Sequence, residues 1–172
     1  YMERRLKDYD RIFVHNPVTI ARLRNVGVIL KRDAIDIGIV GPNLRASGVA
    51  CDTRRADPYC AYPELDFDTI VKDEGDCHAR LLVRVGEVEQ SIRIIRQILD
   101  QIPSGPIFAE NYMKMVAPKM REKAEQTHIM RFPAIFSALR PPKGEAVSRV
   151  EGGRGEVFYY IVSDGSLQPY RF

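Results

Sequence analysis

The apolar residues between positions 81 and 102 constrain the fold more than any other feature of the chain. They recur at alternating steps of four and three residues, a heptad spacing that predicts a long helix over about 75–102. Neighbouring apolar residues widen this face beyond a two-stranded seam, which favours a bundle of several helices. The seam consists of Leu81, Val85, Val88, Ile92, Ile95, Leu99 and Ile102, and it is widened by Leu82, Ile94 and Ile98.

The segments around this helix differ in character. Residues 1–40 predict short N-terminal helices, interrupted where Asn16-Pro17 stops the first of them. Residues 41–73 are punctuated by Gly and Pro and predict a long, ordered loop. Residues 74–140 predict helices, including a Met-rich stretch after the long one. Residues 145–172 predict strands.

The C-terminal strands and the start of the long helix allow finer predictions. An antiparallel pair is expected near 146–151 and 156–163, and a third strand is expected to begin at Gln168. Asp73 is the predicted N-cap of the long helix, with Asp76 three residues later in a capping-box-like arrangement.

Length and composition agree with one globular domain. The chain has 172 residues, 45% hydrophobic and 28% charged, with a net charge of +3 that does not argue for a nucleic-acid partner. We expect an α+β fold, predominantly helical, in which a long-helix bundle carries a small C-terminal antiparallel sheet. Because the sequence begins at Tyr1 and stops at Phe172 inside an apparent strand, residues 1–172 are expected to be a partial domain of a longer subunit.

The sequence offers no complete catalytic apparatus. Its cysteines, Cys51, Cys60 and Cys77, form no C-x-x-C pair, and no metal site is predicted. The serine-hydrolase, zinc-protease and P-loop motifs are also absent from the sequence. The isolated chain is therefore expected to show no oxidoreductase turnover.

One glycine-rich turn has two interpretations. Gly152-Gly153-Arg154-Gly155 lies between two predicted strands. It is either a plain hairpin turn with an exposed arginine or a place where backbone approaches a ligand while Arg154 supplies a fixed charge.

Several ordered stretches carry a more specific signal, and together they cover nearly all of residues 25–172. They are Gly41-Pro42-Asn43-Leu44-Arg45-Ala46-Ser47-Gly48, Asp52-x-Arg54-Arg55, Asp57-Pro58-Tyr59, Gly75-Asp76-Cys77-x-x-Arg80, Glu89 to Ile95, Glu151-x-x-Arg154-Gly155-Glu156, Val162 to Ser166, and Pro169-Tyr170-Arg171. This ordered set resembles the D-subunit family of the NADH–quinone oxidoreductase, respiratory complex I. That family is homologous to the large subunit of nickel-iron hydrogenases.

The resemblance implies a peripheral-arm subunit on the cytoplasmic side of the cell membrane, next to the membrane-arm subunits. It implies packing against a small subunit that holds the terminal iron–sulfur cluster, with quinone reduced in a cavity between the two. NADH, FMN, the iron–sulfur clusters and quinone would belong to the whole complex, and this chain would itself bind no cofactor.

The resemblance also implies candidate site residues. Arg154 occupies the basic position of a cavity-lining Glu-x-Pro-Arg/Lys-Gly segment, although Gly152-Gly153 stands where the family has a small residue and Pro. There Arg154 is expected to stabilise negative charge on a quinone, or to hold Glu151 or Glu156 by charge-assisted hydrogen bonds. The full set of quinone-cavity or subunit-interface candidates is Arg154, Glu151, Glu156, Arg45 and Asp76.

Two other functions stay open at this stage. One is the large subunit of a membrane-bound, energy-converting nickel-iron hydrogenase or a related deazaflavin-dependent dehydrogenase complex, which shares the Asp57-Pro58-Tyr59 stretch. The other is a non-catalytic helical interaction module. The sequence of the longer protein would separate them, since the hydrogenase requires two C-x-x-C motifs.

Overall fold

The computed structural model describes residues 1–106 and 141–172, and the Met-rich helices predicted between them lie outside the described residues. The chain forms two compact units. The first contains residues 1–102 and 149–158, and the second contains residues 103–148 and 159–172. Helices and a two-stranded antiparallel sheet together give an α+β fold. In the described part of the chain, no helix has both the length and the apolar character that a membrane span requires.

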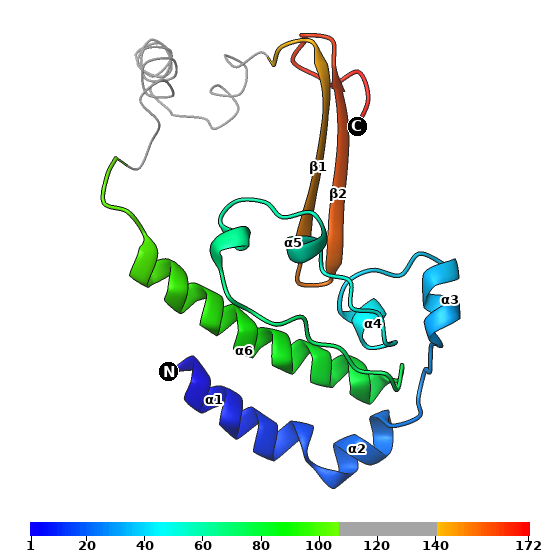
Figure 1. Ribbon diagram of the computed structural model, residues 1–172. Helices are drawn as coiled ribbons and strands as arrows, with labels where there is room; N and C mark the ends of the chain where they lie inside the picture. Colours follow the sequence, from blue (N-terminus) through cyan, green and yellow to red (C-terminus); the bar gives the residue numbers. More distant parts are fainter. Residues whose placement is uncertain (107–140) are drawn as a thin grey trace, which may run out of the picture. The chain divides into compact units, whose positions relative to one another are not determined.

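The predicted long helix is confirmed as α6 (Cys77–Gln101), which Figure 1 shows as the longest helix of the chain. Its N-cap is Asp76 rather than the predicted Asp73. Gly75 has φ +65, which turns the chain so that Asp76 is extended and its side chain accepts a hydrogen bond from the Ala79 N–H at 2.7 Å. The second Asp76 oxygen accepts from the Asn25 N–H at 2.8 Å, so the cap also holds the N-terminal segment.

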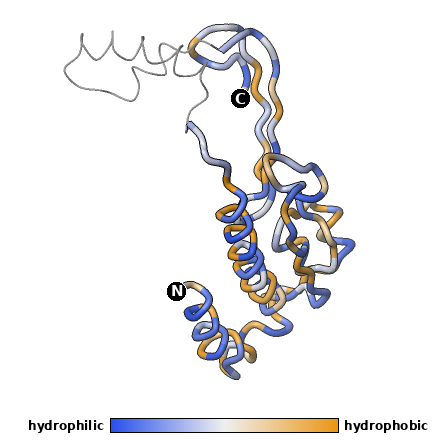
Figure 2. Tube along the Cα trace, turned by 60° about the vertical axis from the view of Figure 1, so that its left-hand side comes forward, coloured by the Kyte–Doolittle hydropathy of each residue, from blue (hydrophilic) through white to orange (hydrophobic). Residues whose placement is uncertain are grey.

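The face of α6 that is buried is not the heptad seam. Ala79, Val83 and Ile94 are buried against the loop segment, whereas Leu99 and Ile102 are each 67% exposed. Figure 2 shows hydrophobic positions recurring along α6. Small residues on the buried face allow the loop to approach the helix closely, whereas the heptad pattern is defined by the large residues alone.

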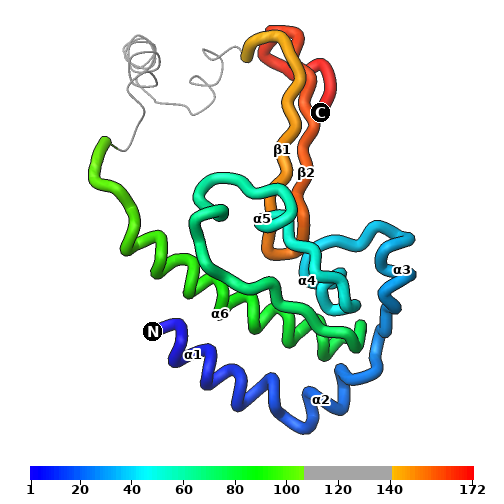
Figure 3. Tube along the Cα trace, in the orientation of Figure 1, coloured from blue at the N-terminus to red at the C-terminus, as the bar shows by residue number. Residues whose placement is uncertain are grey.

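Four helical segments precede the loop. They are α1 (Met2–Tyr9), η1 (Asp10–Val14), α2 (Pro17–Leu23) and α3 (Lys31–Asp36). Asn16 ends the first pair and caps α2, because its side chain accepts a hydrogen bond from the Val18 N–H at 2.9 Å. The first helix lies alongside α6, to which it is joined by a 2.8 Å ion pair between Glu3 and Arg96 (Figure 3).

The loop segment after α3 packs along α6, as Figure 3 also shows. It contains α4 (Pro42–Arg45), α5 (Thr53–Ala56) and η2 (Tyr62–Glu64). Leu65 and Phe67 of this segment are buried with Ile94 of α6 in one apolar cluster.

Side chains of α6 hold the end of the loop. Gln97 accepts a hydrogen bond from the Asp66 N–H at 2.8 Å and donates one to the Asp66 carbonyl at 2.7 Å. Arg93 pairs with the Asp66 and Asp68 carboxylates. These amide and ion-pair contacts replace the backbone hydrogen bonds that an extended segment lacks outside a sheet.

The predicted strand pair is confirmed as β1 (Gly144–Gly152) and β2 (Gly155–Ser163). The predicted third strand is wrong, because the last residues make only a single bridge between Val162 and Arg171. Pro169 has no N–H to donate, so the ladder does not continue on that side.

We predict that Asp76→Ala lowers the free energy of unfolding by about 1 kcal/mol or more, since it removes an N-cap. Burial would raise the pKa of Asp76, but the N–H groups of Ala79 and Asn25 outweigh it and hold that pKa below its ordinary value. The stabilisation is therefore complete at neutral pH and is lost as the pH falls below about 4. Urea unfolding at pH 7 and at acid pH measures both effects. The matched control is Asp73→Ala at an exposed position, which should change stability by less than about 0.5 kcal/mol; an equal loss in both variants would contradict the cap.

Candidate functional site

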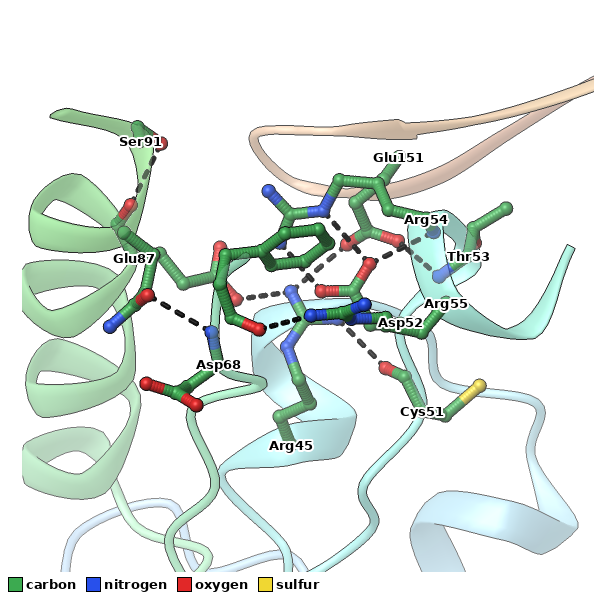
Figure 4. Close-up of polar contacts among 12 residues, drawn as sticks. Arg45, Cys51, Asp52, Thr53, Arg54, Arg55, Asp68, Glu87, Ser91 and Glu151 are labelled. Carbon is green, nitrogen blue, oxygen red and sulfur yellow. Dashed lines mark hydrogen bonds and ion pairs between the residues drawn. The ribbon is translucent and has the colours of Figure 1, made fainter. Parts of the chain in front are cut away.

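Arg45 is a fully buried arginine that joins three distant parts of the chain. It is the last residue of α4, and its Nη2 donates to Glu151 Oε1 of β1 at 2.9 Å and to Glu87 Oε1 of α6. Its Nη1 donates to the Cys51 carbonyl at 2.8 Å. Figure 4 shows both carboxylates converging on this guanidinium.

Glu151 is held from two further directions. Its Oε2 accepts a hydrogen bond from the Thr53 N–H at 3.2 Å, and its own backbone N–H donates to the Tyr59 hydroxyl at 3.0 Å. The side chain is only 5% exposed. Each Glu151 oxygen thus has a partner inside the first unit, and the carboxylate is fixed to the loop segment.

A second buried ion pair lies beside the first. Arg54 donates to both Asp52 oxygens, at 2.9 and 2.6 Å. Burial would raise the pKa of Asp52, but the hydrogen bonds and the charge of Arg54 outweigh it and lower that pKa. The Arg54 guanidinium also lies 5.0 Å from the centre of the Phe67 ring, a cation–π contact that ties it to the apolar core.

We call Arg45, Glu87, Glu151, Asp52 and Arg54 the Arg45 cluster. Its two guanidinium groups and three carboxylates are buried or nearly so, and they bind one another. Because these groups are engaged and shielded from water, the cluster is suited to fixing β1 against α4 and α6 rather than to touching a substrate.

Glu156 lies close to this cluster but is held differently. It accepts hydrogen bonds from Arg149 at 3.1 and 2.8 Å and from the Thr53 hydroxyl at 3.2 Å. The hydrogen bonds from Arg149 lower the pKa of Glu156 and keep it ionised. Thr53 thus links both glutamates of the hairpin to the start of α5.

Arg154 is exposed in the two-residue turn between β1 and β2. The prediction that it holds Glu151 or Glu156 is wrong, because Arg45 binds the first and Arg149 the second. The physical reason is reach: a residue at the tip of the turn extends away from the strands, whereas Arg45 comes from the helix on which the strand rests. In the described residues, no side chain forms an ion pair with Arg154.

The structure therefore brings together three of the five predicted site residues, namely Arg45, Glu151 and Glu156. Asp76 lies apart from them at the start of α6 and serves as its cap. Sequence reasoning missed Glu87, although its position four residues after Val83 places it on the buried face of α6. It also missed Thr53, whose contacts carry no sequence signal.

Comparisons with known proteins agree on one family. The sequence model of the respiratory-chain NADH dehydrogenase, 49 kDa subunit, matches residues 1–172. An NADH-quinone oxidoreductase D subunit of Rhizobium etli, the second of that name, is 43% identical over 170 residues, which is 97% of this chain and 42% of that relative. The D subunit of the NADH-quinone oxidoreductase of Deinococcus radiodurans is 42% identical over 171 residues, 99% of this chain and 43% of the relative. The chain thus spans about two fifths of the length of the curated relatives it matches.

A solved structure gives a similar match. It is the structure of the membrane-bound sulfane sulfur reductase, an archaeal respiratory membrane complex. One of its chains is 43% identical and superposes with a TM-score of 0.78, covering 99% of this chain and 41% of that one. The fold described above is therefore shared with a chain of a solved respiratory complex.

We predict that Arg45→Met lowers the free energy of unfolding by about 3–5 kcal/mol, because it leaves two buried carboxylates without their cation. The matched control is Arg93→Met, which also removes an arginine bound to two carboxylates, but one that is 43% exposed. That variant should lose less than about 1 kcal/mol. Denaturant unfolding of the two variants measures the difference, and equal losses would show that burial of the Arg45 cluster carries no special energy.

Proposed function

Because the chain belongs to the family of the 49 kDa subunit of the respiratory-chain NADH dehydrogenase, we propose that it is part of the D subunit of an NADH–quinone oxidoreductase. The observation that carries this proposal is the family match over residues 1–172, together with relatives named as D subunits at about 43% identity. The chain would then act as one part of a multi-subunit oxidoreductase and not as an enzyme on its own.

In this proposal the hairpin turn faces the quinone. Negative charge develops on a quinone oxygen as electrons arrive, and a fixed cation nearby lowers the barrier to that step. Arg154 is exposed, always charged and carried on a hairpin that the Arg45 cluster holds in place. Glu151 and Glu156 hold the hairpin, and Arg154 is the residue that meets the substrate.

The remaining parts of the proposal concern the surroundings of the chain. The exposed seam residues Ile95, Leu99 and Ile102 fit a predominantly helical bundle completed by further helices of the longer protein. We place the protein peripherally on the cytoplasmic side of the membrane, against a small subunit with the terminal iron–sulfur cluster and beside membrane-arm subunits. Electrons would pass from NADH through FMN and the clusters of those partners.

A second candidate function has its own observation. The chain from the sulfane sulfur reductase is as similar to this one as the NADH-quinone relatives are, at 43% identity. Assaying the purified complex with quinone and with a sulfane sulfur compound as alternative electron acceptors separates the two functions. Nickel analysis of the same preparation tests the hydrogenase alternative.

We predict that Arg154→Ala lowers quinone-linked turnover of the assembled complex about 10²–10³-fold, the usual effect of losing one preorganised group that stabilises developing charge. Arg154→Lys keeps the charge and should retain more of the turnover. Arg32→Ala, at an exposed arginine of α3, is the control and should leave turnover unchanged. Subunit composition is checked first in each variant, and near-normal turnover in a fully assembled Arg154→Ala complex would remove Arg154 from the site.

A further inference from the structure

The backbone next to Arg154 rests directly on a glycine from another part of the chain. Gly41 precedes α4 and has φ +68. A Cβ atom on Gly41 would overlap the Cα of Gly155, and it would lie 2.8 Å from the Gly155 nitrogen and 3.2 Å from the Arg154 carbonyl oxygen. The peptide that follows Arg154 thus occupies the space that any other residue at position 41 would fill.

Gly155 is seated equally closely from its own side. It is buried with φ +138, and a Cβ there would lie 3.0 Å from Val40 Cγ2 and 3.1 Å from the Val40 carbonyl oxygen. The other side of the turn is open, since a Cβ on Gly153 would meet no atom within 4 Å. The turn is therefore clamped on the Gly155 side and free on the Gly153 side.

We propose that Gly41 is a positioning residue for Arg154, acting through the backbone contact with Gly155. This inference rests on the proposed function, in which Arg154 stabilises charge on the quinone. In the described residues the side chain of Arg154 makes no ion pair, so the seat of its backbone sets where the charge is presented. Placement matters because a shift of about 1 Å in a reacting group's surroundings can cost on the order of 10²-fold in rate.

The contact complements the Arg45 cluster. Arg45 holds the first strand of the hairpin through Glu151, and Gly41 holds the second strand through Gly155. Gly41 and Arg45 are the two ends of the same short helix, with Gly41 as the N-cap and Arg45 as the last residue. One rigid turn of helix therefore fixes both strands at the base of the turn.

The test compares Gly41→Ala with Gly38→Ala in the assembled complex. Both positions have left-handed backbone, with φ +68 and φ +71, but a Cβ at Gly38 would meet nothing within 4 Å. Gly41→Ala should lower the kcat of quinone-linked turnover about 10- to 100-fold with little change in the quinone KM, while Gly38→Ala should stay near the wild-type value. A merely structural role would instead reduce the amount of assembled complex and leave the kcat of what assembles unchanged.

A double-mutant cycle decides whether the effect passes through Arg154. If Gly41 positions Arg154, adding Arg154→Ala to Gly41→Ala should cause little further loss. Losses that multiply would overturn the positioning role and leave the proposed function standing. Normal turnover of Arg154→Ala alone would overturn both.

If Gly41→Ala does not assemble, Val40→Ala takes its place in the same cycle. It removes the Cγ2 atom that faces Gly155 from a side chain that is already 41% exposed. We expect a smaller loss of kcat that disappears in the Arg154→Ala background, and a loss that persists there would overturn the inference.

Discussion

The first unit depends on the guanidinium of Arg45. One buried nitrogen binds carboxylates from α6 and β1, and one of these partners is 106 residues away in sequence. Burying such charges costs several kcal/mol per ion, and the cost is offset only when each group finds its partners. The cluster meets this condition through the Cys51 carbonyl, the Thr53 N–H and the neighbouring Asp52–Arg54 pair. A misplaced strand would leave these charges unpaired, so the cluster selects one arrangement of helix, loop and hairpin.

The parts of the fold that the sequence predicted are those with local causes. The heptad spacing predicted α6, and the glycine-rich turn predicted the β1–β2 hairpin. Where two local signals competed, the choice depended on tertiary contacts: Asp76 caps α6 rather than Asp73 because it also binds the Asn25 N–H. The buried face of α6 was missed because small residues such as Ala79 carry little hydrophobic weight, although they permit the closest packing.

The site divides along the same line. Arg45 and Glu151 were candidates because motifs contain them, but no motif shows that they bind each other. Glu87 completes the pair from a helix that was assigned only a packing role. Long-range ion pairs of this kind leave no periodic trace in a sequence, so their partners emerge only when the fold is known.

The pairing of the charges also explains how an exposed cation can be both free and fixed. Had Arg154 bound Glu151, its charge would have been offset by a carboxylate and would be less effective toward a substrate. Arg45 and Arg149 bind the two glutamates of the hairpin instead, which leaves them unavailable to Arg154. Position must then come from uncharged contacts, and the approach of Gly41 to Gly155 supplies one without adding a competing charge. Glycine at position 41 is thus required by the space that the hairpin backbone fills, and only in second place by its own left-handed conformation.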